Sequence, residues 1–386
     1  MPYSLLLEQV RNRPFAVQPL AEPVPIAALP TPALLLDDAA FARNLNKMGT
    51  FLAGKNKGFR PHCKTHKCPI IAEKQLQAGA VGVCAAKVSE AVALVAAGIS
   101  GILITSAIMS PAKAELVGEL ADNAVIDIVV DSLAGLELLR SALPADAHLG
   151  ILIDIDIAMG RTGTRSLATM LRLAEEISAD AKLTYRGIQH YAGHLMHVEG
   201  YAARRDKSLA LWESVSSLLE ALAAAGFTSE VVSGGGTGTY NIDCDVAEVT
   251  DLQVGSYIFM DQEYRLIGDE HGDLFNDFEV ALSVATTAIS QPVDGAITLD
   301  GGYKAFASDT VNPEPLDTPN AKFRFGGDEH GILILGKGAQ EPTLGSVQRF
   351  VVSHCDPTVN LYDGYWVHTD GMVHSRWPIT ARGCSW

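Results

Sequence analysis

The sequence predicts an α/β protein, with a (β/α)8 barrel of the TIM type and a second, antiparallel β domain. Three observations support this prediction. The chain has 386 residues, of which 48% are apolar, and this is enough for a large buried core. Short apolar runs alternate with helix-like stretches as far as about residue 272. Beyond that point the pattern changes to aromatic and β-branched runs separated by Gly, Pro and Asp.

Eight short apolar runs predict the barrel strands, because buried parallel strands read as continuous apolar segments. They lie at residues 59–63, 81–85, 101–105, 125–130, 150–156, 185–191, 230–235 and 252–260. Helix-like segments separate them, at residues 72–80, 88–98, 111–120, 167–178 and 207–226. Eight such units fit a closed barrel better than an open doubly wound sheet. We therefore expect the barrel at residues 28–272.

The rest of the chain predicts the β domain. Its strand-like runs lie at residues 294–306, 331–340, 348–356 and 364–379. We expect this domain to span residues 273–386. Residues 1–27 are rich in Pro and lack a helical period, and we assign them to the same domain, although the sequence alone leaves their position open.

The charge of the chain argues against two classes of partner. There are 45 acidic and 29 basic residues, and the resulting net charge of -16 repels nucleic-acid phosphates and anionic lipids. No apolar run approaches the ~20 residues that span a bilayer, and the first residues lack the pattern of a secretory signal. We expect a cytosolic protein that acts on a small molecule, without nucleic-acid or membrane partners. The six cysteines are scattered, which favours free thiols.

The segment RPHCKTHK places Lys64 at the end of the first barrel strand. Reactive groups of such barrels collect at the carboxyl ends of the strands. The neighbouring Arg60, His62, His66 and Lys67 are expected to lower the pKa of Lys64, which would allow its amine to form a Schiff base. The alternative is a solvated basic loop.

The segment SGGGTGTY, residues 233–240, follows the seventh strand. Its backbone N–H groups can surround an anion, and Thr237 and Thr239 add hydroxyl donors. Gly255 and Ser256 end the next strand, so two adjacent loops could bind one phosphate where barrels often hold it. The alternative is a tight turn that needs glycine only for its conformation.

The segment DIDIAMGRTGT places Arg161 in a turn beyond the fifth strand. Its guanidinium could donate to a ring nitrogen or a carboxylate. The alternative is an ion pair with Asp154 or Asp156.

The segment IQHYAGHLMH ends the sixth strand and carries three histidines, His190, His194 and His197. One of them at the barrel mouth could act as a general base. We expect the other two to be buried and hydrogen-bonded.

In the β domain, SHCDPT would place His354 and Asp356 on one face of a strand, with Cys355 on the other. An imidazole and a carboxylate can hold a divalent cation and leave positions for water and substrate. The alternative is a hydrogen-bonded His–Asp pair.

Together these segments resemble the fold-type III pyridoxal-phosphate enzymes of the D-threonine aldolase and D-serine dehydratase group. The resemblance runs from TPALLLDD at residue 31 to WPITARG near residue 383, through RPHCKTHK, GVCAAKVSEA, GRTG, SGGGTGTY, LQVGSYIFMD, DEHG and SHCDPTVNLYDG. Such a series in one order is far more specific than any single motif. It implies an alanine-racemase-like barrel with a β domain, and a homodimer.

The resemblance also implies roles for individual residues. Lys64 matches the lysine that holds pyridoxal phosphate, and His197 matches a histidine near the substrate hydroxyl. His354 and Asp356 match the pair of metal ligands. The implied cofactor-binding residues besides Lys64 are Arg161 near the pyridine ring, Tyr191, Tyr257 and, at the phosphate, Thr237, Gly238, Thr239, Gly255 and Ser256.

The metal pair separates the branches of this group. In the dehydratase branch of the group that this chain resembles, the metal ligands follow the pattern His-x-Cys and bind zinc. This chain has His-x-Asp instead and in this respect is similar to the aldolases. A carboxylate favours Mn²⁺ or Mg²⁺, with Zn²⁺ as the alternative. We therefore expect a lyase that cleaves D-configured β-hydroxy-α-amino acids, of the D-threonine or 3-hydroxy-D-aspartate type, to glycine and an aldehyde. The alternative is a D-serine or 3-hydroxyaspartate dehydratase, and Ala192, where some relatives have a polar residue, leaves the exact substrate open.

Overall fold

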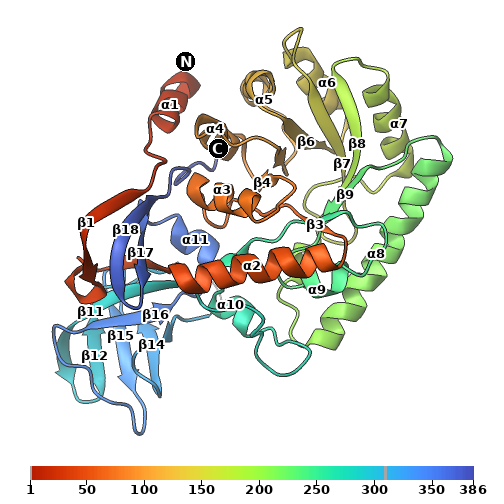
Figure 1. The fold of residues 1–386 in the computed structure, drawn as a ribbon. Coiled ribbons are helices and arrows are strands. Elements are labelled where there is room, and N and C mark those ends of the chain that lie inside the picture. The colour runs from red at the N-terminus through yellow and green to blue at the C-terminus, as the bar shows by residue number, and fades with distance from the viewer. Residues whose placement is uncertain (1, 308–310) are drawn as a thin grey trace.

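The computed structural model describes residues 2–307 and 311–386 and contains two sheets (Figure 1). In the first sheet all neighbouring strands are parallel, in the order β3-β10-β9-β8-β7-β6-β5-β4. A parallel bridge between His62 and Cys84 joins the chain after β3 to β4, so the sheet closes into the predicted barrel. Each strand overlaps one of the eight predicted runs: β3 (Gly58–Phe59), β4 (Val83–Ala85), β5 (Ile102–Ile104), β6 (Ile126–Val130), β7 (Leu149–Ile155), β8 (Leu183–His190), β9 (Val231–Gly234) and β10 (Asp251–Leu252).

Helices cover the outside of the barrel (Figure 1). Helix α7 (Leu167–Ser178) shows why such segments become helical, since its buried residues recur with the helical period at Met170, Leu173, Ala174 and Ile177. The side chain of Ser166 caps it by accepting a hydrogen bond from the Thr169 N–H. The long helices are α3 (Pro69–Gln77), α4 (Val88–Ala96), α5 (Pro111–Asn123), α6 (Leu133–Ala142), α7 (Leu167–Ser178) and α8 (Tyr201–Ala224). Short ones lie in the loops: α9 (Tyr240–Asp243), α10 (Gln262–Arg265), η2 (Gly193–Leu195) and η3 (Ser256–Ile258).

The second sheet has ten strands, and its main path runs β1-β18-β17-β2-β11-β12-β15-β14, with β16 beside β11 and β13 beside β16. It is antiparallel as predicted, except that β17 and β2 are parallel. Its strands are β1 (Gln18–Pro25), β2 (Ala33–Asp37), β11 (Leu282–Val293), β12 (Ala296–Leu299), β13 (Glu314–Pro315), β14 (Ala321–Phe325), β15 (Gly331–Leu335), β16 (Val347–Val351), β17 (Gly364–Thr369) and β18 (Met372–Pro378).

The two ends of the chain connect the sheets. Strand β1 pairs with β18 in the second sheet, whereas α1 (Pro2–Arg11) contacts helix α4 of the barrel. The short helix η1 (Ile26–Ala28) follows β1. Strand β2 also belongs to the second sheet, although it falls within the range 28–272 expected for the barrel. Helix α2 (Asp38–Gly54) then runs from β2 to β3.

One hydrophobic cluster extends through both sheets, from Ile104 and Ile153 in the barrel to Leu282 and Val367 in the second sheet. Helix α11 (Cys355–Val359) lies at the junction. The backbone N–H groups of Gln262 and Glu263 in α10 donate to carbonyls of residues 352 and 353, so the chain leading to α11 is tied to the loop after β10. These hydrogen bonds hold α11, which follows the second sheet's strand β16, beside the barrel.

The six cysteines are buried and unpaired, as predicted. Among the described residues, none of the helices combines the length and the apolar character needed to cross a membrane.

Candidate active site

A cavity at the carboxyl ends of the barrel strands brings together most of the predicted site residues. The loops after β3, β8, β9 and β10 and helix α11 all contribute to its wall. The residues that line it are His62, Lys64, Thr65, Tyr191, His197, Gly236, Thr237, Gln253, Gly255, Ser256, Tyr264, His354 and Asp356.

Lys64 lies in the turn after β3 and faces the second sheet's helix α11. Its Nζ is 3.4 Å from Oδ2 of Asp356, and the two side chains are 42% and 16% exposed. The charge of Asp356 raises the pKa of Lys64 well above its ordinary value. The expectation that neighbouring cations lower this pKa is therefore wrong, because the charge of Asp356, which is 292 residues away in the sequence, has the largest effect.

The other basic residues of this loop are engaged elsewhere. Arg60 pairs with Asp251 at 3.4 Å and Lys67 with Glu90 at 2.5 Å, both pairs being buried. Burial lowers the pKa of His66 to about 4, and its Nδ1 accepts a hydrogen bond from the Cys68 N–H. The segment is thus neither a solvated basic loop nor a cluster of cations around Lys64.

The glycine-rich loop after β9 meets the loop after β10 at this cavity. The Tyr257 N–H donates to Oγ1 of Thr237 at 3.0 Å and links the two loops. Glycine is required at 255, because a Cβ there would lie 2.5 Å from Oγ1 of Thr65. Gly236, Thr237, Gly255 and Ser256 therefore line the same cavity as Lys64.

Three of the predicted cofactor-binding residues point elsewhere. The Thr239 hydroxyl donates to Oδ2 of Asp243 at 2.5 Å. The Gly238 carbonyl accepts from Nε of the buried Arg204 at 2.7 Å, and the Tyr257 hydroxyl accepts from Gln75. None of the three is among the described residues that line the cavity.

Arg161 and Tyr191 come from the loops after β7 and β8. The Arg161 guanidinium lies 5.4 Å from the centre of the Tyr191 ring, an arrangement typical of a cation–π contact. The ion pair considered for Arg161 is made by Arg165 instead, whose Nη2 is 2.7 Å from Oδ2 of Asp156.

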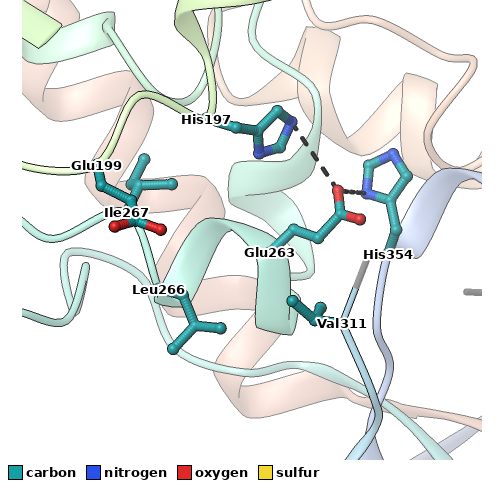
Figure 2. A pocket seen from close by; sticks show the side chains of 7 residues that line it. All are labelled: His197, Glu199, Glu263, Leu266, Ile267, Val311 and His354. Carbon is teal, nitrogen blue, oxygen red and sulfur yellow. Dashed lines mark ion pairs between the residues drawn. The ribbon is translucent and has the colours of Figure 1, made fainter. Parts of the chain in front are cut away.

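The three histidines at the end of β8 and in the loop after it have different environments. His190 is buried as expected, and its ring packs against Trp212 at 5.2 Å. His194 is exposed, so the expectation that it is buried is wrong. His197 lines the cavity. Its Nε2 is 3.9 Å from Oε2 of Glu263, and Figure 2 marks this ion pair with a dashed line.

His354 and Asp356 both face the cavity, but the expected strand does not form. Asp356 lies in the first turn of α11, and His354 is the residue that precedes this helix. His354 Nδ1 is 2.9 Å from Oδ2 of Asp261. Although burial opposes it, the hydrogen bond to Asp261 raises the pKa of His354 to about 9. Against the effect of burial, the charges of Lys64 and His354 hold the pKa of Asp356 well below its usual range.

A second possible ligand group consists of Asp261, His354 and Cys355, whose ligand atoms lie within 4.8 Å of one another. Burial raises the pKa of the Cys355 thiol well above its usual value, which disfavours the thiolate that metals bind. Asp261 already accepts hydrogen bonds from the Tyr264 and Cys355 N–H groups. His354 and Asp356, which line the same cavity, could also hold a metal ion, with Asp261 orienting the imidazole.

Comparison with known proteins places this site in a family. The family model described as the alanine racemase N-terminal domain matches residues 36–263, and the putative serine dehydratase domain matches residues 281–368. A D-threonine aldolase from Arthrobacter sp. is 38% identical over 97% of this chain and 98% of its own length. The chain belongs to the alanine-racemase-like family that contains D-threonine aldolase.

Further members of the family support the same placement. A 3-hydroxy-D-aspartate aldolase from Paracoccus denitrificans is 34% identical over 92% of each chain. The crystal structure of D-threonine aldolase from Filomicrobium marinum superposes with a TM-score of 0.90 at 35% identity, covering 95% of this chain and all of that one.

The family implies pyridoxal phosphate, and the side chains of this cavity fit that cofactor. The Lys64 amine can bond to its aldehyde, while the N–H groups of the glycine loop and the hydroxyls of Thr237 and Ser256 can bind its phosphate. The buried His62 Nδ1 has no hydrogen-bond partner within the described chain, which leaves a polar atom of the wall available.

Two residues of this family member's site escaped the sequence analysis: Asp261 and Glu263. Within its own segment, Asp261 has only the role of an N-cap for α10, since its Oδ1 accepts a hydrogen bond from the Tyr264 N–H. The pattern DQE after the eighth strand could have been flagged by the same rule that selected the other loops. Its contact with His354, 93 residues further along the chain, could not have been found that way.

Proposed function

We propose that this protein is an aldolase that depends on pyridoxal phosphate and a divalent metal and cleaves D-configured β-hydroxy-α-amino acids to glycine and an aldehyde. The observation that carries the proposal is the single cavity shared by Lys64, His197, His354 and Asp356. It combines an amine, a partly exposed imidazole and a pair of metal-ligand side chains on one small-molecule site.

Lys64 would hold the cofactor covalently, and Thr237, Gly255 and Ser256 would bind its phosphate. Arg161 and Tyr191 would lie on the pyridine side of the cavity. Gly238, Thr239 and Tyr257 would contribute by shaping the two loops, because the Gly238 carbonyl and the Thr239 and Tyr257 hydroxyls are bonded to residues outside the cavity. Bound there, pyridoxal phosphate withdraws electrons from the bonds at the substrate Cα.

His354 and Asp356 would hold the metal, with Mn²⁺ or Mg²⁺ preferred over Zn²⁺. The metal would act as a Lewis acid on the substrate hydroxyl. The ion pair between Lys64 and Asp356 supports this assignment. With the Lys64 amine bonded to the cofactor, a divalent ion would take its place as the cationic partner of Asp356.

His197 would take the proton of the substrate β-hydroxyl as the bond between Cα and Cβ breaks. Its side chain is 44% exposed and its Nε2 is 3.9 Å from Oε2 of Glu263, so the ring is oriented while it remains accessible. Lys64 would return a proton to the glycine carbon.

The competing function is a dehydratase that forms a 2-oxo acid and ammonia. A D-threo-3-hydroxyaspartate dehydratase from Delftia sp. is 27% identical to this chain, less than the two aldolases. The His-x-Asp pair also favours the aldolase.

A product assay with D-threonine, D-3-hydroxyaspartate and D-serine, with and without Mn²⁺, tests the proposal. Glycine and an aldehyde are expected, with activity that depends on the metal. Ammonia and a 2-oxo acid would instead assign the dehydratase. The homodimer and the cytosolic location stay predictions.

A further inference from the structure

We propose that a second cavity, next to the one that holds Lys64, receives the substituent on the substrate β-carbon and selects apolar substituents over carboxylates. This inference rests on the proposed function and names the class of substrate within it. The second cavity has a volume of about 460 Å³ and shares His197 and His354 with the first (Figure 2).

The order of groups along the substrate matches the order of side chains along the two cavities. The amino group belongs at Lys64, and the β-hydroxyl belongs at His197 and His354. The substituent on the β-carbon then lies on the far side of the two histidines, where the second cavity begins.

The wall of the second cavity is partly apolar. Leu266 and Ile267 directly follow helix α10. Val311, which lies between β12 and β13 of the second sheet, also lines this cavity (Figure 2). Leu266 is 41% exposed, and an apolar group bound beside it would remove part of this surface from water.

The charged groups of this wall are acidic. Glu263 lies between the two histidines, with its Oε2 3.6 Å from Nδ1 of His354 and 3.9 Å from Nε2 of His197. Glu199 is the second carboxylate, and no lysine or arginine is found among the described lining residues. The His354 imidazole already faces Asp261 and Glu263.

Beyond the metal ligands, a carboxylate substituent would therefore lose water and face Glu199 and Glu263, with no lysine or arginine among the described lining residues to pair with it. The same argument excludes the substrate's α-carboxylate from this cavity. The protein should consequently prefer D-threonine and its apolar homologues over D-3-hydroxyaspartate.

Binding of two amino acids without a hydroxyl tests the inference independently of cleavage. Calorimetric titration of the cofactor-loaded protein should give a dissociation constant for D-2-aminobutyrate at least about tenfold lower than that for D-aspartate. Leu266→Arg should shift this ratio toward D-aspartate by about tenfold or more, because it adds a cation to the wall. Glu199→Gln should shift the ratio in the same direction by a smaller factor.

Leu274→Arg is the matched control, since Leu274 is 40% exposed but lies outside the cavity wall. Equal affinity for the two amino acids in the unmodified protein would overturn the inference, as would equal effects of Leu266→Arg and Leu274→Arg. Failure to bind either amino acid would also overturn it. Selective binding of D-2-aminobutyrate without cleavage of D-threonine would refute the aldolase function and leave the selectivity of the cavity standing.

Discussion

Lys64 shows how one distant contact changes the chemistry of a side chain. Its sequence neighbours are mostly basic, yet Arg60 and Lys67 are neutralised by Asp251 and Glu90, and Lys64 itself faces Asp356. In the free protein the amine is therefore held protonated. A cofactor that bonds to Lys64 has to replace this ion pair.

Replacing Lys64 with alanine should remove the visible absorbance of the bound cofactor, because no other lysine lines the described part of the cavity. Absorbance spectra of the purified variant in excess pyridoxal phosphate measure this directly. Lys55→Ala is the control: Lys55 is also 42% exposed and paired with an aspartate, Asp245. An unchanged spectrum in Lys64→Ala would remove this residue from the mechanism.

His197→Gln should lower kcat by roughly 10²–10⁴-fold, the usual contribution of a positioned general base. Cofactor absorbance should stay the same, since Lys64 and the glycine loop are untouched. Steady-state kinetics with D-threonine provide the test, and His194→Gln, an exposed histidine of the same loop, is the control. Equal turnover in the two variants would rule out His197 as the base.

Among the elements, helix α11 departs most from expectation. The segment SHCDPT was expected to form a strand, but the chain turns into a helix directly after His354. Pro357 explains this outcome, because proline is disfavoured inside strands and tolerated in the first turn of a helix. The helix still directs His354 and Asp356 into one cavity.

The two proposed metal ligands, His354 and Asp356, lie at the start of helix α11. Chelation with EDTA should abolish cleavage while the cofactor absorbance persists. Asp356→Cys should reduce activation by Mn²⁺ at least about tenfold, because a thiolate is a softer ligand and even outer partners of a metal site contribute that much. Activity measured over a series of Mn²⁺ and Zn²⁺ concentrations would show the change.

Asp363→Cys is the control for this substitution, since Asp363 is 71% exposed and pairs with Arg382. Full activity in EDTA would contradict the role of the metal. A metal profile of Asp356→Cys equal to that of Asp363→Cys would show that Asp356 is not a ligand.

At the scale of the whole molecule, buried ionisable groups couple stability to pH. Burial lowers the pKa of His190 from 6.5 to about 4. Between these values the unfolded chain binds a proton that the folded chain does not, so stability falls as the pH falls from 6.5 to 4. Asp243 acts in the opposite sense, because burial raises its pKa to about 6 and stability is lost as the pH rises toward that value.

Comparison of His190→Gln with the unmodified protein isolates the first effect. The free energy of unfolding is measured with urea between pH 7 and pH 4.5. Below pH 6.5, its decrease per pH unit should be smaller in the variant than in the unmodified protein by about 1.4 kcal/mol. His148→Gln, at an exposed position, should keep the dependence of the unmodified protein. Parallel curves for all three proteins would show that His190 does not titrate on unfolding.

The sequence by itself determined the barrel, the second sheet and most of the cavity's residues. Strands buried on both faces are rich in apolar residues, and this local property is clearest in the runs at 101–105 and 125–130. The rule that strand ends carry the chemistry then selected Lys64, Thr237 and Ser256.

Only the tertiary structure decided the electrostatics of the site and the second cavity. The pair of Lys64 with Asp356, and that of His354 with Asp261, join segments that are far apart in the chain. Coulomb and hydrogen-bond energies depend on distances in space, and residues so far apart in the sequence come within a few ångströms only after both sheets have packed. The same packing places Glu263 between His197 and His354, which no local pattern could show.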